Sequence, residues 1–129
     1  MRSLTVQQVI ALQELLIKKD GGLSGVKDVS LIDASLRSPF QTFDGIDLYP
    51  TKIDKIVRTS YNLIRNHCFA DGNKRIGVYV LIALLRLNGF EVKLDSEHLI
   101  KIGLEVGSGE MSYEAYKTFF EVNYQSQQA

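Results

Sequence analysis

One short stretch of the chain gathers the residue types that phosphate chemistry needs. Residues 67–75 read His-Cys-Phe-Ala-Asp-Gly-Asn-Lys-Arg. An imidazole can remove a proton from a hydroxyl near neutral pH, and a carboxylate is the hard oxygen ligand that magnesium takes alongside substrate phosphates. We therefore interpret His67 as a general base and Asp71 as a magnesium ligand.

The elements on either side place this stretch at the start of a helix. Residues 52–66 carry apolar side chains at helical spacing, and residues 76–87 are almost continuously apolar, which is typical of a helix buried on most sides. The first turn of a helix leaves backbone N–H groups unpaired and carries partial positive charge, so phosphate binds there readily. The polar cluster is therefore expected in a short connection, just before the more buried helix.

Four residues of the cluster suit a phosphate site. Asn73 is expected to be the N-cap of the second helix, and Gly72 lets the backbone approach an anion closely. Lys74 adds a point charge, and Arg75 can grip phosphate oxygens with two parallel hydrogen bonds. The combination of base, metal ligand and phosphate site indicates phosphoryl or nucleotidyl transfer from a nucleotide.

Each of these residues also has a purely structural interpretation. A histidine at a helix end is commonly a surface or capping group, and Asp71 could merely cap the next helix. Lys74 and Arg75 could form a solvated helix face, although two cations in a first turn oppose the macrodipole unless an anion binds. Phe69 is expected to be a buried anchor for the loop, and Cys68 has no partner that would make it a nucleophile.

The stretch resembles the signature of the Fic/Doc superfamily. The matching pattern is His67-x-Phe69-x-Asp71-Gly72-Asn73-x-Arg75. Fic enzymes, which mostly transfer AMP, usually have a second glycine where this chain has Lys74 and a second arginine where it has Val78. The chain departs from that form and is similar to the Doc form, and residues 21–25 and 106–110 also look like Doc. The resemblance covers nearly the whole chain.

The Doc resemblance implies a toxin of a toxin–antitoxin pair that acts as a kinase. It implies transfer of the γ-phosphate of ATP, with magnesium, to a threonine of translation elongation factor Tu. In this chain His67 would activate the hydroxyl and Asp71 would hold magnesium. The phosphates would be held by Gly72, Asn73, Lys74 and Arg75. Lys74 and Arg75 would also stabilise the negative charge that develops during transfer, so the catalytic residues would be His67, Lys74 and Arg75. Two alternatives remain open: an AMP transferase of the Fic kind, and a non-catalytic binding or regulatory module.

Regulation is expected in trans. Many Fic proteins carry an inhibitory helix whose glutamate is followed by glycine or asparagine, and no glutamate of this chain is followed by either. The resemblance instead implies a small Phd-like antitoxin that lays a helical segment into an apolar groove.

Composition narrows the class of protein. The 129 residues are expected to form one domain, 1–129, and equal numbers of acidic and basic side chains leave no net charge to attract nucleic acid or an acidic membrane. A single cysteine fits a reducing cytoplasm, and the chain shows neither a signal peptide nor an apolar run of the roughly 20 residues that span a bilayer. We expect a cytoplasmic protein that is a monomer when free.

The expected fold is all-α, a compact Fic/Doc-like helical bundle. Helices are predicted over residues 5–19, 31–37, 52–66, 76–87, 95–106 and 112–124. Residues 38–50, with an Asp-Gly turn, could form a short hairpin that acts as a target-holding flap, or a plain surface connection. The glycines of residues 21–25 are expected to form a turn without a ligand-binding role. The cations Lys52, Lys55, Arg58 and Arg65 are expected on a solvated face, residues 90–94 as an extended segment, and residues 125–129 as a frayed tail.

Overall fold

The protein is mostly helical, as the sequence predicts. The computed structural model describes residues 1–91 and 95–124. Its elements are α1 (Val6–Asp20), α2 (Val29–Arg37), a 3-10 turn (Ser38–Phe40), β1 (Thr42–Phe43), β2 (Ile46–Asp47), α3 (Lys52–Arg65), α4 (Asn73–Leu87), α5 (Ser96–Ser108) and α6 (Tyr113–Tyr124). The segments expected at 90–94 and 125–129 fall largely or wholly outside the described residues. In the described part of the chain, no helix is both long and apolar enough to cross a membrane.

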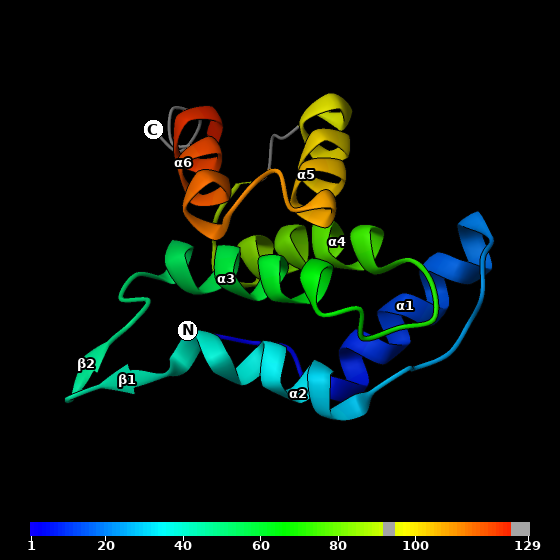
Figure 1. The fold of residues 1–129 in the computed structure, drawn as a ribbon, viewed down its shortest axis with the longest axis horizontal. Helices are drawn as coiled ribbons and strands as arrows, with labels where there is room; N and C mark the ends of the chain where they lie inside the picture. The colour runs from blue at the N-terminus through cyan, green and yellow to red at the C-terminus, as the bar shows by residue number, and fades with distance from the viewer. Residues whose placement is uncertain (92–94, 125–129) are drawn as a thin grey trace.

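An antiparallel pair of helices, α3 and α4, forms the centre of the fold. Figure 1 shows α1 and α2 on one side of this pair and α5 and α6 on the other. Both central helices are covered on most sides, and Ile56, Leu63, Ile76 and Leu81 are fully buried. Burial of each such side chain contributes about 1.5–3 kcal/mol. The connection between α3 and α4 contains the candidate residues and lies beside α1 (Figure 1).

A glycine allows the two central helices to approach closely. A Cβ placed on Gly77 of α4 would lie 2.2 Å from Cγ1 of Ile64 and 3.1 Å from the carbonyl oxygen of Ser60, both on α3. The Ser60 hydroxyl donates a hydrogen bond to the Gly77 carbonyl at 2.7 Å and lies 2.8 Å from the Tyr116 hydroxyl of α6. These groups are buried, and their mutual hydrogen bonds offset the cost of removing them from water, so they join three helices.

Several helix ends follow the residues that predict them. Thr51 and Asp54 form a capping box at the start of α3, and Asp95 accepts the His98 N–H at the start of α5. The Ser112 hydroxyl accepts the Ala115 N–H in the first turn of α6. Gly89, with φ +88°, follows the C-cap of α4. These caps are predictable because each depends on residues within four positions of one another.

The hairpin expected within residues 38–50 is present. Phe43 pairs with Ile46, and Asp44 and Gly45 both have positive φ in the two-residue turn between the strands. The hairpin lies at the N-terminal end of α3, whereas the candidate residues follow its C-terminal end (Figure 1). The 14 residues of α3 span about 21 Å. A role as a target-holding flap stays a prediction, and a target on the hairpin would have to extend along α3 to reach His67.

The expected solvated face of α3 is wrong for two of its cations. Lys55 is only 9% exposed, and its ammonium donates to the Tyr49 carbonyl and to Asp47. The Arg58 guanidinium lies over the rings of Tyr49, Tyr61 and Tyr113, 5.1 to 5.3 Å from their centroids. The segment after the hairpin and the start of α6 cover this face, which the helical periodicity of α3 does not reveal.

We expect Gly77→Ala to destabilise the protein. Alanine is favoured over glycine within a helix by about 1 kcal/mol. Here the added methyl group would force Ile64 and the α3 backbone away, at a cost of about 1–3 kcal/mol. Urea unfolding followed by circular dichroism measures the difference.

Gly103→Ala is the matched control for this substitution. Its Cβ would meet no atom of another element closer than 3.6 Å, so we expect unchanged or slightly increased stability. Equal stability of the Gly77→Ala variant and the unmodified protein would show that α3 and α4 are not closely packed at this point.

Candidate functional site

The start of α4 leaves backbone donors free. Gly72 is the N-cap, with φ +75°, and offers no side chain to accept hydrogen bonds. The Ile76 N–H donates to the Gly72 carbonyl at 2.8 Å. The N–H groups of Asn73, Lys74 and Arg75 have no partner within the described residues. Three donors and the positive end of the helix dipole thus face outward together, which is the arrangement that binds anions.

Asn73 is not the N-cap, contrary to the prediction. It is the first helical residue, and its side chain points back into the connection between α3 and α4. Its amide oxygen accepts the Phe69 N–H and its amide nitrogen donates to the Phe69 carbonyl, each at 3.0 Å. Phe69 itself is 1% exposed, as expected of an anchor. The Asn73 side chain therefore fixes the loop, and its backbone N–H has no partner within the described residues.

The carboxylate of Asp71 is held by backbone donors. One oxygen accepts the Leu23 N–H at 3.1 Å, and the other accepts the Gly72 N–H at 2.8 Å. These hydrogen bonds, followed by the nearby charge of Arg75, hold the pKa of the Asp71 carboxyl below its usual range. Each carboxylate oxygen keeps a second lone pair that can bind a cation.

The loop after α1 supports this carboxylate. The motif loop, which we define as residues 66–72, pairs with residues 21–28: the Ala70 N–H donates to the Gly25 carbonyl, and Val26 forms a β-bridge with Phe69. A Cβ on Gly22 would lie 2.5 Å from the Asp71 carboxylate. Residues 21–25 form an irregular loop with a bend at Gly22, and the absence of a side chain at Gly22 makes room for the Asp71 carboxylate.

Sequence reasoning missed one residue that helps to build the site. Gln13 of α1 is 1% exposed, and its side-chain amide donates to the Asp71 carbonyl at 3.2 Å and to the Leu23 carbonyl at 3.4 Å. Gln13 therefore links the loop after α1 to the motif loop. The available signal was a glutamine placed four residues after Val9 and three before Leu16, on the apolar face of α1.

His67 lies at the other end of the motif loop. It directly follows the C-cap of α3, has φ +50° and is exposed to solvent. The next residue, Cys68, is fully buried, and its carbonyl accepts the N–H groups of Lys27 and Asp28. The imidazole is thus presented to solvent between two fixed segments. Burial raises the pKa of the Cys68 thiol, which agrees with its exclusion as a nucleophile.

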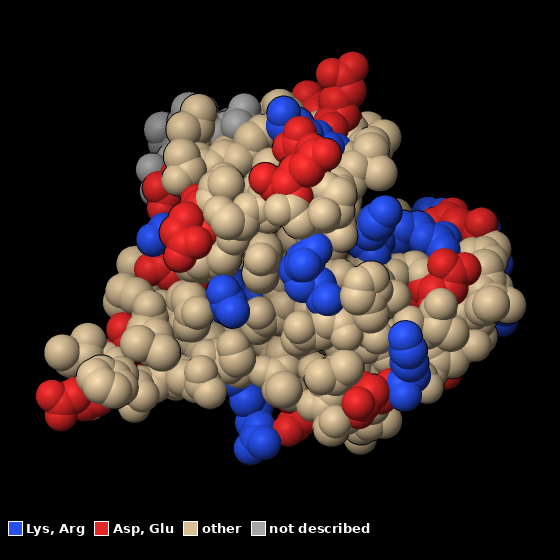
Figure 2. Space-filling model, viewed as in Figure 1, with Lys and Arg blue, Asp and Glu red and all other residues tan. Residues whose placement is uncertain are grey.

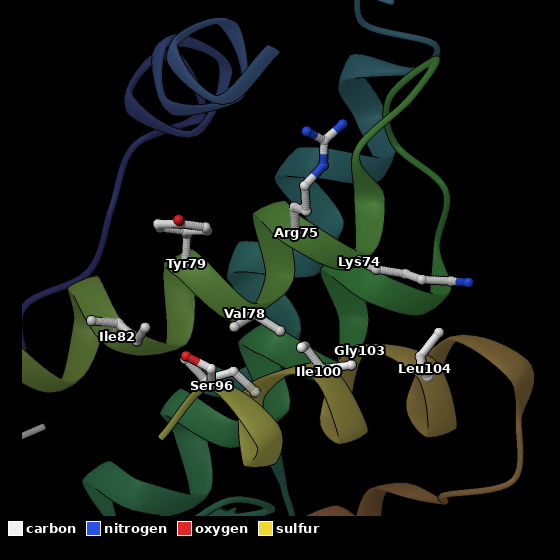
Figure 3. A pocket seen from close by; sticks show the side chains of 10 residues that line it. Lys74, Arg75, Val78, Tyr79, Ile82, Ser96, Ile100, Gly103 and Leu104 are labelled. Carbon is white, nitrogen blue, oxygen red and sulfur yellow. The ribbon is translucent and has the colours of Figure 1, made fainter. Parts of the chain in front are cut away.

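The two cations of the first turn point in different directions. Arg75 turns toward the end of α1, where its guanidinium donates to the Gly21 carbonyl at 3.2 Å and lies 4.0 Å from the Asp20 carboxylate. Lys74 extends away from Arg75 (Figure 3). Figure 2 shows basic side chains gathered on this side of the molecule, where α1 ends and α4 begins. The cations therefore flank the free N–H groups instead of stacking beside each other.

Lys74 runs along α5. A Cβ placed on Gly107 would lie 2.7 Å from Cε of Lys74, and one on Gly103 would lie 3.6 Å from its Cβ. Arg65 holds the end of α5 in place, because its guanidinium donates to the carbonyls of Val106 and Gly107 at 3.4 and 3.2 Å. Arg65 is exposed, but it is a helix-capping residue and not simply part of a solvated face.

An apolar groove adjoins these cations. It lies between α4 and α5, has a volume of about 390 Å³, and includes Lys74 and Arg75 in its lining (Figure 3). The apolar lining comes from Val78, Tyr79, Ile82, Leu99, Ile100 and Leu104. Ile100 is 61% exposed and Leu104 is 56% exposed, so the groove presents apolar surface to solvent. We refer to it as the α4–α5 groove.

The donor set fits a magnesium ion that is shared with phosphates. Among the described residues there is no group of three or more histidine, cysteine or carboxylate side chains that would enclose a metal by itself. Asp71 offers one ionised carboxylate beside the free N–H groups of α4. Magnesium commonly takes one or two carboxylates and completes its shell with water and substrate phosphates.

The fold and the site together define a helical domain in which a histidine-containing loop leads into a helix that has no side-chain cap at its start. The chain belongs to the Fic/DOC family, whose model matches residues 3–85. The resemblance recognised in the motif is thereby confirmed.

Two relatives indicate the Doc branch of this family. The chain is 37% identical over 75 residues to the protein named Toxin Doc of Mycolicibacterium smegmatis, a match that covers 58% of each chain. It is 30% identical over 117 residues to the protein named Protein kinase doc of Escherichia phage P1, and this match covers 87% of each chain. The first match therefore spans just over half of that relative's length, and the second spans most of both proteins.

The Asp71 contacts predict an unusually acidic carboxyl group. Because the folded pKa lies below the unfolded value, the ionised group stabilises the fold at pH values above the unfolded pKa, and this contribution is lost as pH falls through the folded pKa. Carbonyl-detected NMR titration should give an inflection for Asp71 at lower pH in the protein than in a peptide of residues 67–75. Equal inflections would show that the Leu23 and Gly72 N–H groups do not hold the carboxylate in solution.

Proposed function

We propose that this protein is a Doc-type toxin kinase. It transfers the γ-phosphate of ATP to a threonine hydroxyl of elongation factor Tu and so blocks translation in the cytoplasm. The observation that carries this proposal is the start of α4, where three N–H groups without an acceptor among the described residues lie beside Lys74 and Arg75. The names of the two relatives, one a toxin and one a protein kinase, support the same assignment.

The proposed reaction uses groups at both ends of the motif loop. His67 removes the proton from the threonine hydroxyl, whose oxygen attacks the γ-phosphorus. The bond from that phosphorus to the bridging oxygen breaks, and ADP leaves. The N–H groups of residues 73–75 and the side chains of Lys74 and Arg75 stabilise the charge that develops on the phosphates.

Asp71 is the residue that would hold magnesium in this scheme. Its carboxylate is kept ionised by two backbone hydrogen bonds, so it is ready to bind a cation at neutral pH. The bound ion supplies charge neutralisation at the phosphates. Gly22 and Gln13 act indirectly, because they fix the position of Asp71.

The two alternatives are less well supported. AMP transfer of the Fic kind is associated with a glycine and a second arginine, and this chain has Lys74 and Val78 at those positions. Val78 is 7% exposed and apolar, so it supplies no charge. A non-catalytic module would have no need for the exposed His67 together with the ionised Asp71.

Labelled ATP tests the proposed reaction. The protein is incubated with magnesium, elongation factor Tu and ATP labelled at either the γ- or the α-phosphate. We expect label from the γ-phosphate only, and we expect His67→Ala to reduce the transfer by about 10²–10⁴-fold, because it removes the general base. Label from the α-phosphate would instead show AMP transfer, and label from neither would contradict the proposed target.

His98→Ala is the matched histidine control. His98 lies in α5, 3.4 Å from Asp95 and edge-on to Phe119, away from the motif loop. We expect this variant to transfer phosphate at the unmodified rate. If both histidine variants lost activity equally, the assignment of His67 as the base would be wrong.

We further propose that a Phd-like antitoxin neutralises the protein by placing a helical segment in the α4–α5 groove. The groove is apolar and solvent-exposed, as the docking surface of an amphipathic helix must be. It ends at Lys74 and Arg75, so its occupant would also cover the phosphate site. Control by an antitoxin is consistent with the relative named as a toxin.

A charge placed in the groove tests this docking site. We expect Ile100→Glu to weaken binding of the cognate antitoxin at least about tenfold in calorimetric titration, because the carboxylate would be desolvated against an apolar helix. Leu15→Glu is the control, since Leu15 is similarly exposed, at 63%, but lies on α1. Wild-type affinity of the Ile100→Glu variant would place the antitoxin elsewhere.

A further inference from the structure

The stem of Lys74 lies flat on the backbone of α5. A Cβ placed on Gly107 would come within 2.7 Å of Cε of Lys74 and within 3.2 Å of its Cδ and Cγ. At Gly103, one turn earlier, a Cβ would meet Lys74 at the ordinary contact distance of 3.6 Å. Gly107 therefore provides the surface on which the outer half of the lysine side chain lies.

The conformation of α5 does not require glycine at this position. Gly107 lies inside the helix and is absent from the residues with positive φ, whereas Gly109 just beyond the helix has φ +88°. Alanine would favour a helical backbone more than glycine does. The missing side chain at Gly107 is thus explained by its neighbour Lys74 and not by its own backbone.

A second contact keeps this part of α5 in place. The Arg65 guanidinium, at the end of α3, donates to the Gly107 carbonyl at 3.2 Å and to the Val106 carbonyl at 3.4 Å. A Cβ on Gly109 would lie 3.3 Å from the same guanidinium. Arg65 immediately precedes the C-cap Asn66, and His67 follows, so the surface under Lys74 is attached to the segment that presents the imidazole.

We propose that Gly107 is a positioning residue that sets where the Lys74 ammonium stands beside the start of α4. A lysine side chain is flexible in solution, and contact of its stem with α5 restricts that freedom. This inference rests on the proposed function, in which Lys74 holds phosphate. It deepens that function, because Gly107 would then control the position of a cation that the proposed reaction uses.

A measurement without substrate tests the positioning itself. In Gly107→Ala the stem of Lys74 must move by roughly 1 Å to restore ordinary contact distances. We expect the rate of Lys74 modification by acetic anhydride, followed by peptide mass spectrometry, to rise about twofold or more as the stem loses its packing. Gly103→Ala should leave the rate unchanged. Arg65→Met removes the hydrogen bonds that hold the end of α5, so it should raise the modification rate of Lys74 as Gly107→Ala does. This variant provides the same test if Gly107→Ala does not fold.

A kinetic cycle tests the consequence for transfer. We expect Gly107→Ala to lower kcat/KM for γ-phosphate transfer about 10- to 100-fold, because displacement of a charged group by about 1 Å is costly. In a Lys74→Met background the same substitution should have no further effect. A merely structural role of Gly107 would instead give equal losses in both backgrounds.

The outcomes separate this inference from the proposed function. Unchanged modification of Lys74 in both Gly107→Ala and Arg65→Met, or equal losses in both backgrounds of the cycle, would overturn the role of Gly107. Absence of phosphate transfer by the unmodified protein would overturn the proposed function, and the modification rates would still decide whether Gly107 positions Lys74.

Discussion

The unsatisfied start of α4 is the constraint around which the rest of the site is arranged. Gly72 provides no side-chain cap, and Lys74 and Arg75 add charge of the same sign as the helix dipole at that end. Each unfavourable charge–dipole contact costs about 0.3–1 kcal/mol. The fold offsets this only in part: Asp71 accepts the Gly72 N–H and lies near Arg75, and the Gly21 carbonyl accepts a guanidinium hydrogen bond. An anion at the three N–H groups would complete the balance, because none of the residues that the structure describes accepts their hydrogen bonds.

Two loops paired side by side make this arrangement rigid. The chain after α1 gives N–H groups to the Cys68 carbonyl and accepts the Ala70 N–H, while Asn73 binds both backbone groups of Phe69. The motif loop is thus held by backbone hydrogen bonds at nearly every residue between His67 and α4. This explains how an exposed histidine with φ +50° can be kept in place, although that conformation costs about 1–2 kcal/mol for a residue with a Cβ. The end of α3 before His67 and the buried Cys68 after it restrict the backbone conformation of His67.

The sequence predicts the parts of this structure that depend on near neighbours in the chain. The helical spacing of apolar residues, the capping box at Thr51 and the hairpin turn at Asp44 each depend on residues within about four positions of one another. The structure contains all three features. The role of Asn73 was misjudged because its side chain can either cap a helix or bind a loop, and the choice depends on the burial of Phe69. The environment of Arg58 depends on Tyr113 of α6, which lies 55 residues later in the sequence. The contact of Lys74 with α5 depends on Gly107, which lies 33 residues later. No local pattern encodes such contacts.

The arrangement also separates two surfaces that partners of different kinds would use. The α4–α5 groove includes Lys74 and Arg75 in its lining, so under the proposed function a helix that fills it would compete with phosphate for space at the start of α4. The hairpin lies at the opposite end of α3 from His67, with Phe43 and Ile46 both more than 70% exposed (Figure 1). A ligand of the groove would therefore act on the nucleotide side of the reaction without touching the hairpin. Because α3 connects the two ends as one continuous helix, the hairpin and His67 have a fixed spacing. A protein substrate that contacted the hairpin and reacted at His67, as the proposed function requires, would have to match that length.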